Sequence, residues 1–466
     1  MTDSLETLSQ DTRQFDSATN PSTGELDLEA RDALRRIAGL NTELEDISEV
    51  EYRQLRLERV VLIGVWSGRD DSAITRSMSE LAALAETAGS QVLDVLVQRR
   101  DQPDTGTYIG SGKLKELRQI VVATGADTVI CNGELSPSQL TKMEAIVKVK
   151  VIDRTWLILD IFAQHARSRE GKAQVSLAQM QYMLPRLRGW GDALSRQAGG
   201  IGTRGPGETK LESDRQRIGK SMAKLRREIR AMGTARQVQR AARERNNVPS
   251  VALAGYTNSG KSSLLNRLTN AGVLVENALF ATLDPTTRQS FTPSGRVFTL
   301  SDTVGFVRDL PHQLVEAFRS TLEEVSASDL LLHVVDGSDV DPEGQISAVH
   351  SVLNEIDASG ITEIIVINKA DIADPIVINR LRLLSPLCVV VSAHTGEGID
   401  ELRELIEQHL PHPRVDVHVV VPFARGDLLA RTYREGQVLS RVETQDGTEL
   451  VARVSPELAH DLRGAC

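Results

Sequence analysis

The sequence predicts a multidomain α/β protein, and three observations support this fold class. Short apolar runs alternate with amphipathic runs over residues 59–165, as expected of a parallel sheet covered by helices. A second alternation starts at the apolar run 251–254, which leads through a glycine-rich loop into a helix. Between these regions, residues 167–246 carry apolar side chains at heptad spacing, which predicts packed helices. A chain of 466 residues has room for about three domains.

Cysteine usage and hydropathy exclude several classes of protein. The cysteines are odd in number, far apart and without metal-ligand spacing (Cys131, Cys388 and Cys466), which argues against a disulfide framework or a zinc site. No apolar run approaches the roughly 20 residues of a membrane-spanning helix, and residues 1–20 are polar and acidic, unlike a signal peptide. We therefore expect a soluble cytoplasmic protein, for which a peripheral association with membranes stays open.

Charge is distributed unevenly along the chain. The net charge is −10, yet residues 167–246 hold 19 Lys or Arg against 7 Asp or Glu, a local surplus of +12 that leaves −22 for the rest. Residues 1–55 are rich in Ser, Thr, Asp and Glu and poor in large apolar groups. This composition predicts a disordered acidic extension that contributes no core.

Residues 56–166 are predicted to form an N-terminal α/β subdomain. The stretch Tyr108-Ile109-Gly110-Ser111-Gly112-Lys113 resembles a phosphate-binding loop only superficially, because it lacks the first glycine and follows a polar turn. We expect a glycine turn that opens a helix; a contact of Lys113 with nucleic acid or nucleotide phosphate is the alternative. Asp153 and His165 are expected to be structural. Strands are expected at 60–65, 92–97, 128–131 and 149–152, and helices at 73–88, 114–122, 140–147 and 157–163.

Residues 167–246 are predicted to form a basic antiparallel helical hairpin. Pro185 falls inside the apolar pattern of the first helix and predicts a kink or an early end there. The glycine-rich stretch 199–208 is expected to be an exposed loop at the tip. The surplus of positive charge favours a phosphate-rich partner, with a solvated charged coiled coil as the alternative. The expected seam consists of Leu177, Met180, Leu184 and Leu187 in the first helix and Leu211, Ile218, Met222, Leu225, Ile229 and Met232 in the second.

The loop after residue 254 fits a phosphate-binding pattern of Gly, four residues and Gly-Lys-Ser. It follows a strand-like run and opens a helix, which is the context that the pattern requires. The glycines let backbone N–H groups converge on a polyphosphate, Lys261 adds positive charge at the β- and γ-phosphates, and the Ser262 hydroxyl can ligate Mg²⁺. The residues expected to contact a nucleotide here are Gly255, Tyr256, Thr257, Asn258, Ser259, Gly260, Lys261, Ser262 and Ser263.

Two later segments of the predicted domain 247–411 complete a triphosphate site. In the segment 280–288, Thr282 is the expected ligand of Mg²⁺ and the γ-phosphate, with Thr286 and Thr287 as rivals and a plain polar loop as the alternative. After a strand at 297–300, Asp302 would hold Mg²⁺ through water and the Gly305 N–H would meet the γ-phosphate. We thus predict a catalytic set of Lys261, Thr282 and Gly305, a metal site of Ser262, Thr282 and Asp302, and a further nucleotide contact at Phe280.

The tetrapeptide Asn368-Lys369-Ala370-Asp371 identifies the base. The Asp371 carboxylate would accept two hydrogen bonds from the N1–H and exocyclic amine of guanine, which adenine cannot supply. A strand-like run then leads to Ser392-Ala393-His394, which places a backbone N–H near guanine O6. Five such motifs, in this order and each at a strand end, predict a P-loop, Ras-like GTPase domain that binds GTP.

Together these motifs resemble the HflX family, in the Obg-HflX group of translational GTPases. The resemblance spans about residues 59–466 and rests on the tip sequence 199–212, the segment 182–187, the switch 281–286 and the motif 302–306. It implies an N-terminal domain made of the α/β subdomain and the hairpin, followed by the GTPase domain. A small α+β C-terminal domain over 412–466 is implied to follow, with strands at 418–422, 438–442 and 449–454.

The resemblance also implies a function. Family membership implies binding to the large (50S) ribosomal subunit and its rRNA, with the glycine-rich tip near the peptidyl-transferase region. It further implies that stalled ribosomes are split under stress while GTP is hydrolysed to GDP and phosphate, by a protein expected to be a monomer. Some members are described as hydrolysing ATP through the N-terminal domain, coupled to RNA remodelling. The alternative is a nucleotide-gated switch that binds RNA or an acidic protein.

Phe306 departs from the Ras-like pattern, in which a Gln at this position orients the attacking water. Phenylalanine has no donor or acceptor for a water molecule. We therefore expect slow GTP hydrolysis by the isolated protein and acceleration by a bound partner that orders the switch loops.

Overall fold

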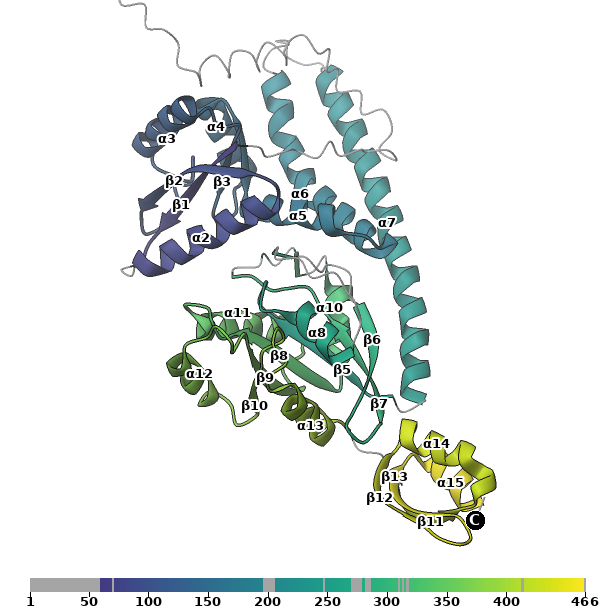
Figure 1. Ribbon diagram of the computed structural model, residues 1–466. Helices are drawn as coiled ribbons and strands as arrows, with labels where there is room; N and C mark the ends of the chain where they lie inside the picture. Colours follow the sequence, from purple (N-terminus) through teal and green to yellow (C-terminus); the bar gives the residue numbers. More distant parts are fainter. Residues whose placement is uncertain are drawn as a thin grey trace, which may run out of the picture.

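The structure, a computed structural model, describes residues 59–68, 71–195, 206–245, 248–269, 279–280, 286–308, 311, 314–315, 318–411 and 415–464. Three sheets follow one another along the chain, and two long helices connect the first sheet to the second (Figure 1). The predicted acidic extension 1–55, the tip residues 199–205 and Thr282 lie outside the described residues.

The first sheet is parallel and carries helices on both faces, as predicted. Its strands run in the order β2-β1-β3-β4, and all its pairings are parallel. Val60 and Leu62 face α2 and α5, whereas Val61 and Ile63 face α3 and α4, because successive strand residues point to opposite faces. The elements are β1 (Arg59–Trp66), α2 (Asp71–Thr87), β2 (Gln91–Arg99), α3 (Ser111–Thr124), β3 (Thr128–Cys131), α4 (Pro137–Val147), β4 (Lys150–Asp153) and α5 (Arg154–His165).

Asp153 and Lys113 both have partners within the N-terminal part of the chain. Asp153 is fully buried and caps α5 by accepting a hydrogen bond of 2.9 Å from the Trp156 N–H. It also pairs with Arg186 at 3.1 Å. The predicted glycine turn is present, since Gly110 precedes the first residue of α3 and Lys113 forms an ion pair of 2.8 Å with Glu116 on that helix.

The hairpin consists of α6 (Arg169–Ser195) and α7 (Pro206–Arg245), which pack against each other. The predicted early end at Pro185 is wrong, because α6 continues through this residue. Its neighbours explain the continuation: Arg186 stacks 3.4 Å from the Tyr182 ring centroid and donates to the Leu135 carbonyl. The predicted tip loop is also too long, because α7 starts at Pro206, and proline suits the first turn of a helix.

The second sheet has six strands in the order β10-β9-β8-β5-β7-β6, and all pairings except β6 with β7 are parallel. Thr286 and Thr287 lie in β6 rather than in an open loop, and the Thr287 hydroxyl lies 2.8 Å from that of Ser301. The elements are β5 (Ser250–Gly255), α8 (Lys261–Thr269), β6 (Thr286–Phe291), β7 (Val297–Asp302), α10 (Arg319–Ser326), β8 (Leu330–Asp336), α11 (Pro342–Glu355), β9 (Thr362–Asn368), α12 (Pro375–Arg382), β10 (Cys388–Val390) and α13 (Ile399–His409).

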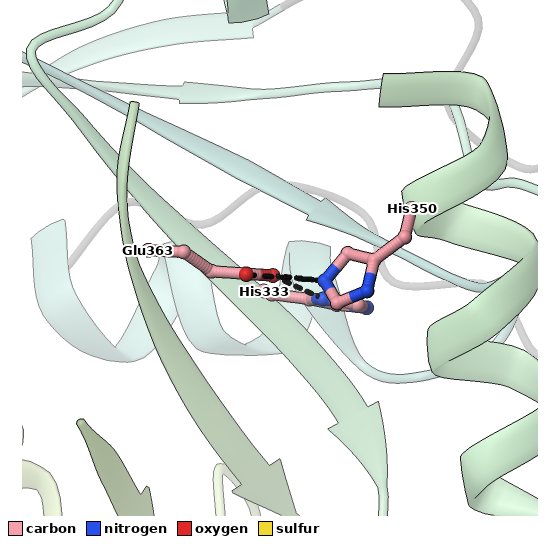
Figure 2. Close-up of side chains that lie close together, drawn as sticks. All are labelled: His333, His350 and Glu363. Carbon is pink, nitrogen blue, oxygen red and sulfur yellow. Dashed lines mark hydrogen bonds and ion pairs between the residues drawn. The ribbon is translucent and has the colours of Figure 1, made fainter. Parts of the chain in front are cut away.

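Strand β8 is buried at every residue and is apolar except for two positions. One is Asp336 at its carboxyl end. The other is His333, whose ring meets Glu363 and His350 on one face of the sheet (Figure 2).

The third sheet is antiparallel, in the order β11-β13-β12, with two helices packed on it. The elements are β11 (Val415–Val421), the 3₁₀ turn η2 (Phe423–Arg425), α14 (Gly426–Glu435), β12 (Gln437–Glu443), β13 (Thr448–Val454) and α15 (Pro456–Gly464). All three expected strands of this region are confirmed. Within the described ranges, no helix combines the length and apolar character needed to cross a membrane.

Candidate functional site

The loop between β5 and α8 has a backbone that requires its glycines. Gly255 has φ +153°, and a Cβ there would lie 2.2 Å from the Val334 carbonyl oxygen. Gly260 has φ +91°, and its Cβ would lie 2.3 Å from the Asn368 amide nitrogen. Both positions exclude any larger side chain, so this loop keeps the close approach that a bound phosphate needs.

Lys261 lies across this loop as the first residue of α8. It is 6% exposed, and its Nζ donates to the carbonyls of Gly255 (3.1 Å) and Tyr256 (2.8 Å). Burial lowers the pKa of Lys261 to about 8, against the opposing effect of Asp302. Burial therefore disfavours the ammonium form of Lys261 more than Asp302 stabilises it. The negative charge of a phosphate bound nearby would stabilise the ammonium.

Two buried hydroxyls in the loop also indicate a ligand. The Oγ1 of Thr257 and the Oγ of Ser259 are buried and make no hydrogen bond among the described residues. Buried polar groups are rarely left in this state without a functional reason. A polyphosphate is rich in acceptor oxygens and fits both hydroxyls.

The predicted magnesium residues that the structure describes lie together. The Ser262 hydroxyl donates to Asp302 Oδ2 at 2.6 Å, and hydroxyl and carboxylate oxygens are ligands that suit Mg²⁺. Gly305 lies beside them: a Cβ on this residue would be 2.9 Å from Thr257 Cα and 3.1 Å from Lys261 Nζ. The Gly305 backbone thus reaches the phosphate loop. Two hydrogen bonds join this loop to the next residue, Phe306: the Thr257 N–H donates to the Phe306 carbonyl (2.7 Å), and the Phe306 N–H donates to the Gly255 carbonyl (3.1 Å).

Asn368 joins the phosphate loop to the loop after β10. Its side-chain nitrogen donates to the Ser259 carbonyl at 2.8 Å, and its oxygen accepts from the Ala393 N–H at 3.0 Å. Because β5, β9 and β10 are parallel, their carboxyl ends meet at one edge of the sheet, where α/β folds bind ligands. Asn368 fixes the spacing between the phosphate end and the base end of the site.

Asp371 lies at the base end, where one of its oxygens is already occupied. Oδ1 accepts a hydrogen bond of 2.7 Å from the Ser392 hydroxyl, and this bond lowers the pKa of Asp371. His394 is mostly exposed and lies 3.9 Å from Oδ2. Lys369 pairs with Asp336 at 2.6 Å. The carboxylate therefore stays ionised, with Ser392 on Oδ1 and His394 nearer to Oδ2.

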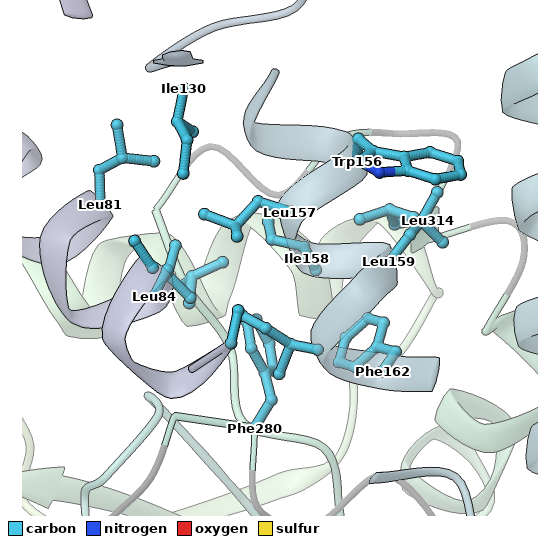
Figure 3. Close-up of a cluster of buried hydrophobic side chains, with 14 of the residues drawn as sticks. Leu81, Leu84, Ile130, Trp156, Leu157, Ile158, Leu159, Phe162, Phe280 and Leu314 are labelled. Atoms are coloured by element: carbon cyan, nitrogen blue, oxygen red, sulfur yellow. The ribbon is translucent and has the colours of Figure 1, made fainter. Parts of the chain in front are cut away.

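The side chains of two predicted nucleotide contacts point elsewhere. Phe280 is 2% exposed and packs edge-to-face on Phe162 of α5, with ring centroids 4.7 Å apart (Figure 3). The Tyr256 hydroxyl donates to Glu80 of α2 and accepts from the Arg308 N–H at 2.7 Å. Only the backbone of these residues remains for a nucleotide. Loop residues Asn258 and Ser263 fall in the described part, and Thr282 does not.

These contacts form an interface between the first sheet's helices and the phosphate site, which the sequence did not reveal. Arg154 of α5 pairs with Glu80 and donates to the Arg308 carbonyl at 2.9 Å. Arg308 in turn pairs with Asp341 at 2.6 Å. Apolar residues on both sides of this polar network share one buried cluster (Figure 3).

Comparison with protein-family models gives four successive matches. They are described as GTP-binding GTPase N-terminal (residues 75–163), GTP-binding GTPase middle region (165–243), 50S ribosome-binding GTPase (250–369) and HflX C-terminal domain (383–464).

Curated relatives are similar over most of the chain. The GTPase HflX of Lacrimispora saccharolytica is 45% identical over 417 residues, covering 90% of this chain and 97% of that protein. The GTPase HflX of Escherichia coli is 40% identical over 394 residues, covering 84% and 92%. Among solved structures, the SsGBP–GDP complex is 26% identical and covers 75% of this chain and 98% of that one, with a TM-score of 0.44.

Proposed function

The chain belongs to the HflX family of GTP-hydrolysing P-loop enzymes, and from this premise we propose that it binds the large (50S) ribosomal subunit and splits stalled ribosomes under stress. One observation carries the proposal, a continuous path of contacts from the nucleotide site to the basic hairpin. Phe280 and Arg308 contact α5, α5 packs on α6, and α6 packs on α7. A rearrangement of the segments around a γ-phosphate therefore reaches the hairpin.

The chemistry assigned to the site is an in-line attack of water on the γ-phosphorus of GTP. The bond between this phosphorus and the β–γ bridging oxygen breaks, and GDP leaves with the electron pair. Lys261 stabilises the charge on the phosphates, and the Gly305 backbone contacts the γ-phosphate. Mg²⁺, which would neutralise charge between the β- and γ-phosphates, would be held by Ser262, Asp302 and Thr282.

The electrostatics of α7 favour ribosomal RNA as the surface that the hairpin meets. The seam residues Ile218, Met222, Leu225, Ile229 and Met232 are buried or half-buried, as predicted. Six cationic side chains of the described part of this helix are exposed, and a surface of this kind attracts a polyanion. They are Arg217, Lys220, Lys224, Arg226, Arg227 and Arg230.

Phe306 explains why the partner would also complete the catalytic site. Its side chain is 1% exposed and packs with Ala252, Ala254 and Leu331 in the core. It therefore cannot contact a water at the γ-phosphate. The group that orients the water has to come from the switch loops or from the ribosome.

Sedimentation of ribosomes tests the proposal. Intact 70S ribosomes would be incubated with the protein and GTP, a non-hydrolysable GTP analogue or GDP, and the subunits separated on sucrose gradients. A variant in which residues 199–205 are replaced by a Gly-Ser linker of equal length leaves α6 and α7 intact. We expect the parent to split ribosomes in the GTP state and the variant to lose splitting while binding GTP normally.

Two outcomes contradict the proposal. Splitting that does not depend on the nucleotide would remove the link between the GTPase site and the hairpin. Failure to co-sediment with large subunits would instead favour a nucleotide-gated switch with another RNA or an acidic protein as partner.

A further inference from the structure

Three side chains on one face of the second sheet form a cluster that the nucleotide site does not use (Figure 2). His333 comes from β8, Glu363 from β9 and His350 from α11. One potential ligand atom from each lies within 4.8 Å of the other two. Imidazole and carboxylate are the side-chain groups with which proteins most often hold transition metals.

Both imidazole rings direct a nitrogen at the same carboxylate. His333 Nδ1 lies 2.6 Å from Glu363 Oε1, and His350 Nε2 lies 2.9 Å from Oε1 and 3.1 Å from Oε2. The two rings are 5.3 Å apart at an interplanar angle of 69°. Both nitrogens therefore approach the same carboxylate oxygen, Oε1, so that three potential ligand atoms gather at one place.

The strand register explains how the backbone sets this geometry. His333 pairs with Ile365, and Leu331 pairs with Glu363, so the side chains of His333 and Glu363 are diagonal neighbours on the same face. Helix α11 covers this face, with Val349 in the apolar core. His350, the next residue, consequently lies at the edge of the covered area.

Packing alone does not account for a histidine at residue 333. Its side chain is 1% exposed in a strand that is otherwise apolar up to Asp336. A buried imidazole without a partner costs free energy, and Glu363 supplies the partner for His333 Nδ1 here. The cluster has an open side as well, since the side chain of His350 is 43% exposed and that of Glu363 is 25% exposed. An ion can enter from solvent, and water can fill a fourth position.

We propose that His333 Nδ1, His350 Nε2 and the Glu363 carboxylate bind one divalent transition metal ion, Zn²⁺ or a metal of similar preference, with a fourth position open to water. Metal–ligand bonds of about 2.0–2.1 Å in a tetrahedron place ligand atoms roughly 3.3 Å apart. From 2.6 Å and 2.9 Å, the Glu363 oxygen must therefore move away from His333 Nδ1 by about 0.7 Å and from His350 Nε2 by about 0.4 Å. His350 and Glu363 can make this movement because both side chains are partly exposed. Mg²⁺ prefers oxygen ligands and is not expected here.

Metal titration of the untagged, nucleotide-free full chain tests the proposal. Zn²⁺ would be titrated in competition with a chromophoric chelator, and Co²⁺ binding followed by its visible absorption. We expect one tight equivalent per chain, and affinity at least about tenfold weaker in His350→Ala and in Glu363→Gln, because each removes a ligand. Millimolar Mg²⁺ should not displace the ion.

His418 and Glu449 provide a matched control, because this exposed pair lies 2.6 Å apart and, among the residues that the structure describes, has no third ligand beside it. His418→Ala should leave the titration unchanged. His333 is buried, so the test uses the half-exposed positions, and circular dichroism with GDP binding verifies that each variant is folded. Absence of a stoichiometric equivalent, or equal affinity in the parent, His350→Ala and Glu363→Gln, would overturn the proposal. Neither result depends on ribosome splitting.

Discussion

At the scale of single residues, the Ser392 hydroxyl orients the Asp371 carboxylate. The Ser392 hydroxyl occupies Oδ1, so in Asp371→Asn the amide oxygen would keep this bond and the amide nitrogen would face the base. The exchange turns an acceptor into a donor. We expect binding of GTP to weaken by at least about a hundredfold and xanthosine triphosphate to become the preferred nucleotide.

Competition with a fluorescent guanine nucleotide measures this change. Asp374→Asn is the matched control, because Asp374 caps α12 through the Ile376 N–H (2.8 Å) at an exposed site nearby. That variant should bind GTP as the parent does. If Asp371→Asn also retained parental affinity for GTP, the assignment of base recognition would be wrong.

Fixed motif spacing was enough to predict which residues of the candidate site lie together, and it failed where a side chain finds its partner through the fold. Lys261, Ser262 and Asp302 are brought together as expected. The orientation of Tyr256 was not predictable, because the loop pattern leaves this position free. Its partner, Glu80, lies 176 residues away along the chain.

At the scale of elements, that partnership joins α2 to the phosphate loop. The Tyr256 hydroxyl bonds Glu80 and the Arg308 N–H at once, and burial raises its pKa, so it stays a donor. Tyr256→Phe removes both bonds and leaves Glu80 with one partner fewer in a largely buried site. We expect a loss of about 1–3 kcal/mol in the free energy of unfolding.

Urea denaturation of Tyr256→Phe, Glu80→Ala and the double variant measures this coupling. The second substitution should lower the free energy of unfolding by less when the first is already present, since both break the same hydrogen bond. Additive costs would show that the hydroxyl and the carboxylate do not stabilise each other.

The hairpin is the element that we expect to meet RNA, and its binding should therefore weaken as salt rises. Each lost phosphate contact should reduce the slope of log affinity against log salt by about 0.7. We predict that Lys220→Glu with Lys224→Glu flattens the slope of large-subunit binding. Charge reversal of two exposed basic residues elsewhere, Arg382 and Arg434, should leave this slope unchanged. Binding that is independent of salt would indicate an apolar partner surface.

Strands and helices were predictable because their apolar periods are regular. Pro185 shows the limit of that reasoning, because, of the kink or early end predicted there, the early end is wrong. Proline disfavours the interior of a helix locally, but Tyr182 and Arg186 on the same turn contact Trp156, Leu135 and Asp153. These tertiary contacts hold the helix on both sides of the proline, and no local pattern contains them.

At the scale of the whole molecule, the first sheet's helices are in direct contact with the segments around the candidate phosphate site. Phe162 touches both Phe280 and Phe318, and the polar network through Arg154 continues the contact to Arg308. The order of domains followed from the motifs, whereas this interface joins residues far apart in sequence and needed the structure. It places the hairpin and the candidate GTPase site in one contiguous unit of contacts.

This unit predicts how the rate of hydrolysis responds to the ribosome. Because Phe306 is buried and cannot orient water, the isolated protein should hydrolyse GTP slowly. Purified large subunits should accelerate single-turnover hydrolysis by ordering the switch loops.

Lys261→Ala should lower the rate by roughly 10²–10³-fold with and without subunits, because it removes charge stabilisation at the phosphates. Phe306→Ala should affect turnover only through packing of the motif around Gly305, so its stimulation by subunits should persist. Rapid hydrolysis by the protein alone, unchanged by large subunits, would mean that the site is complete without its partner.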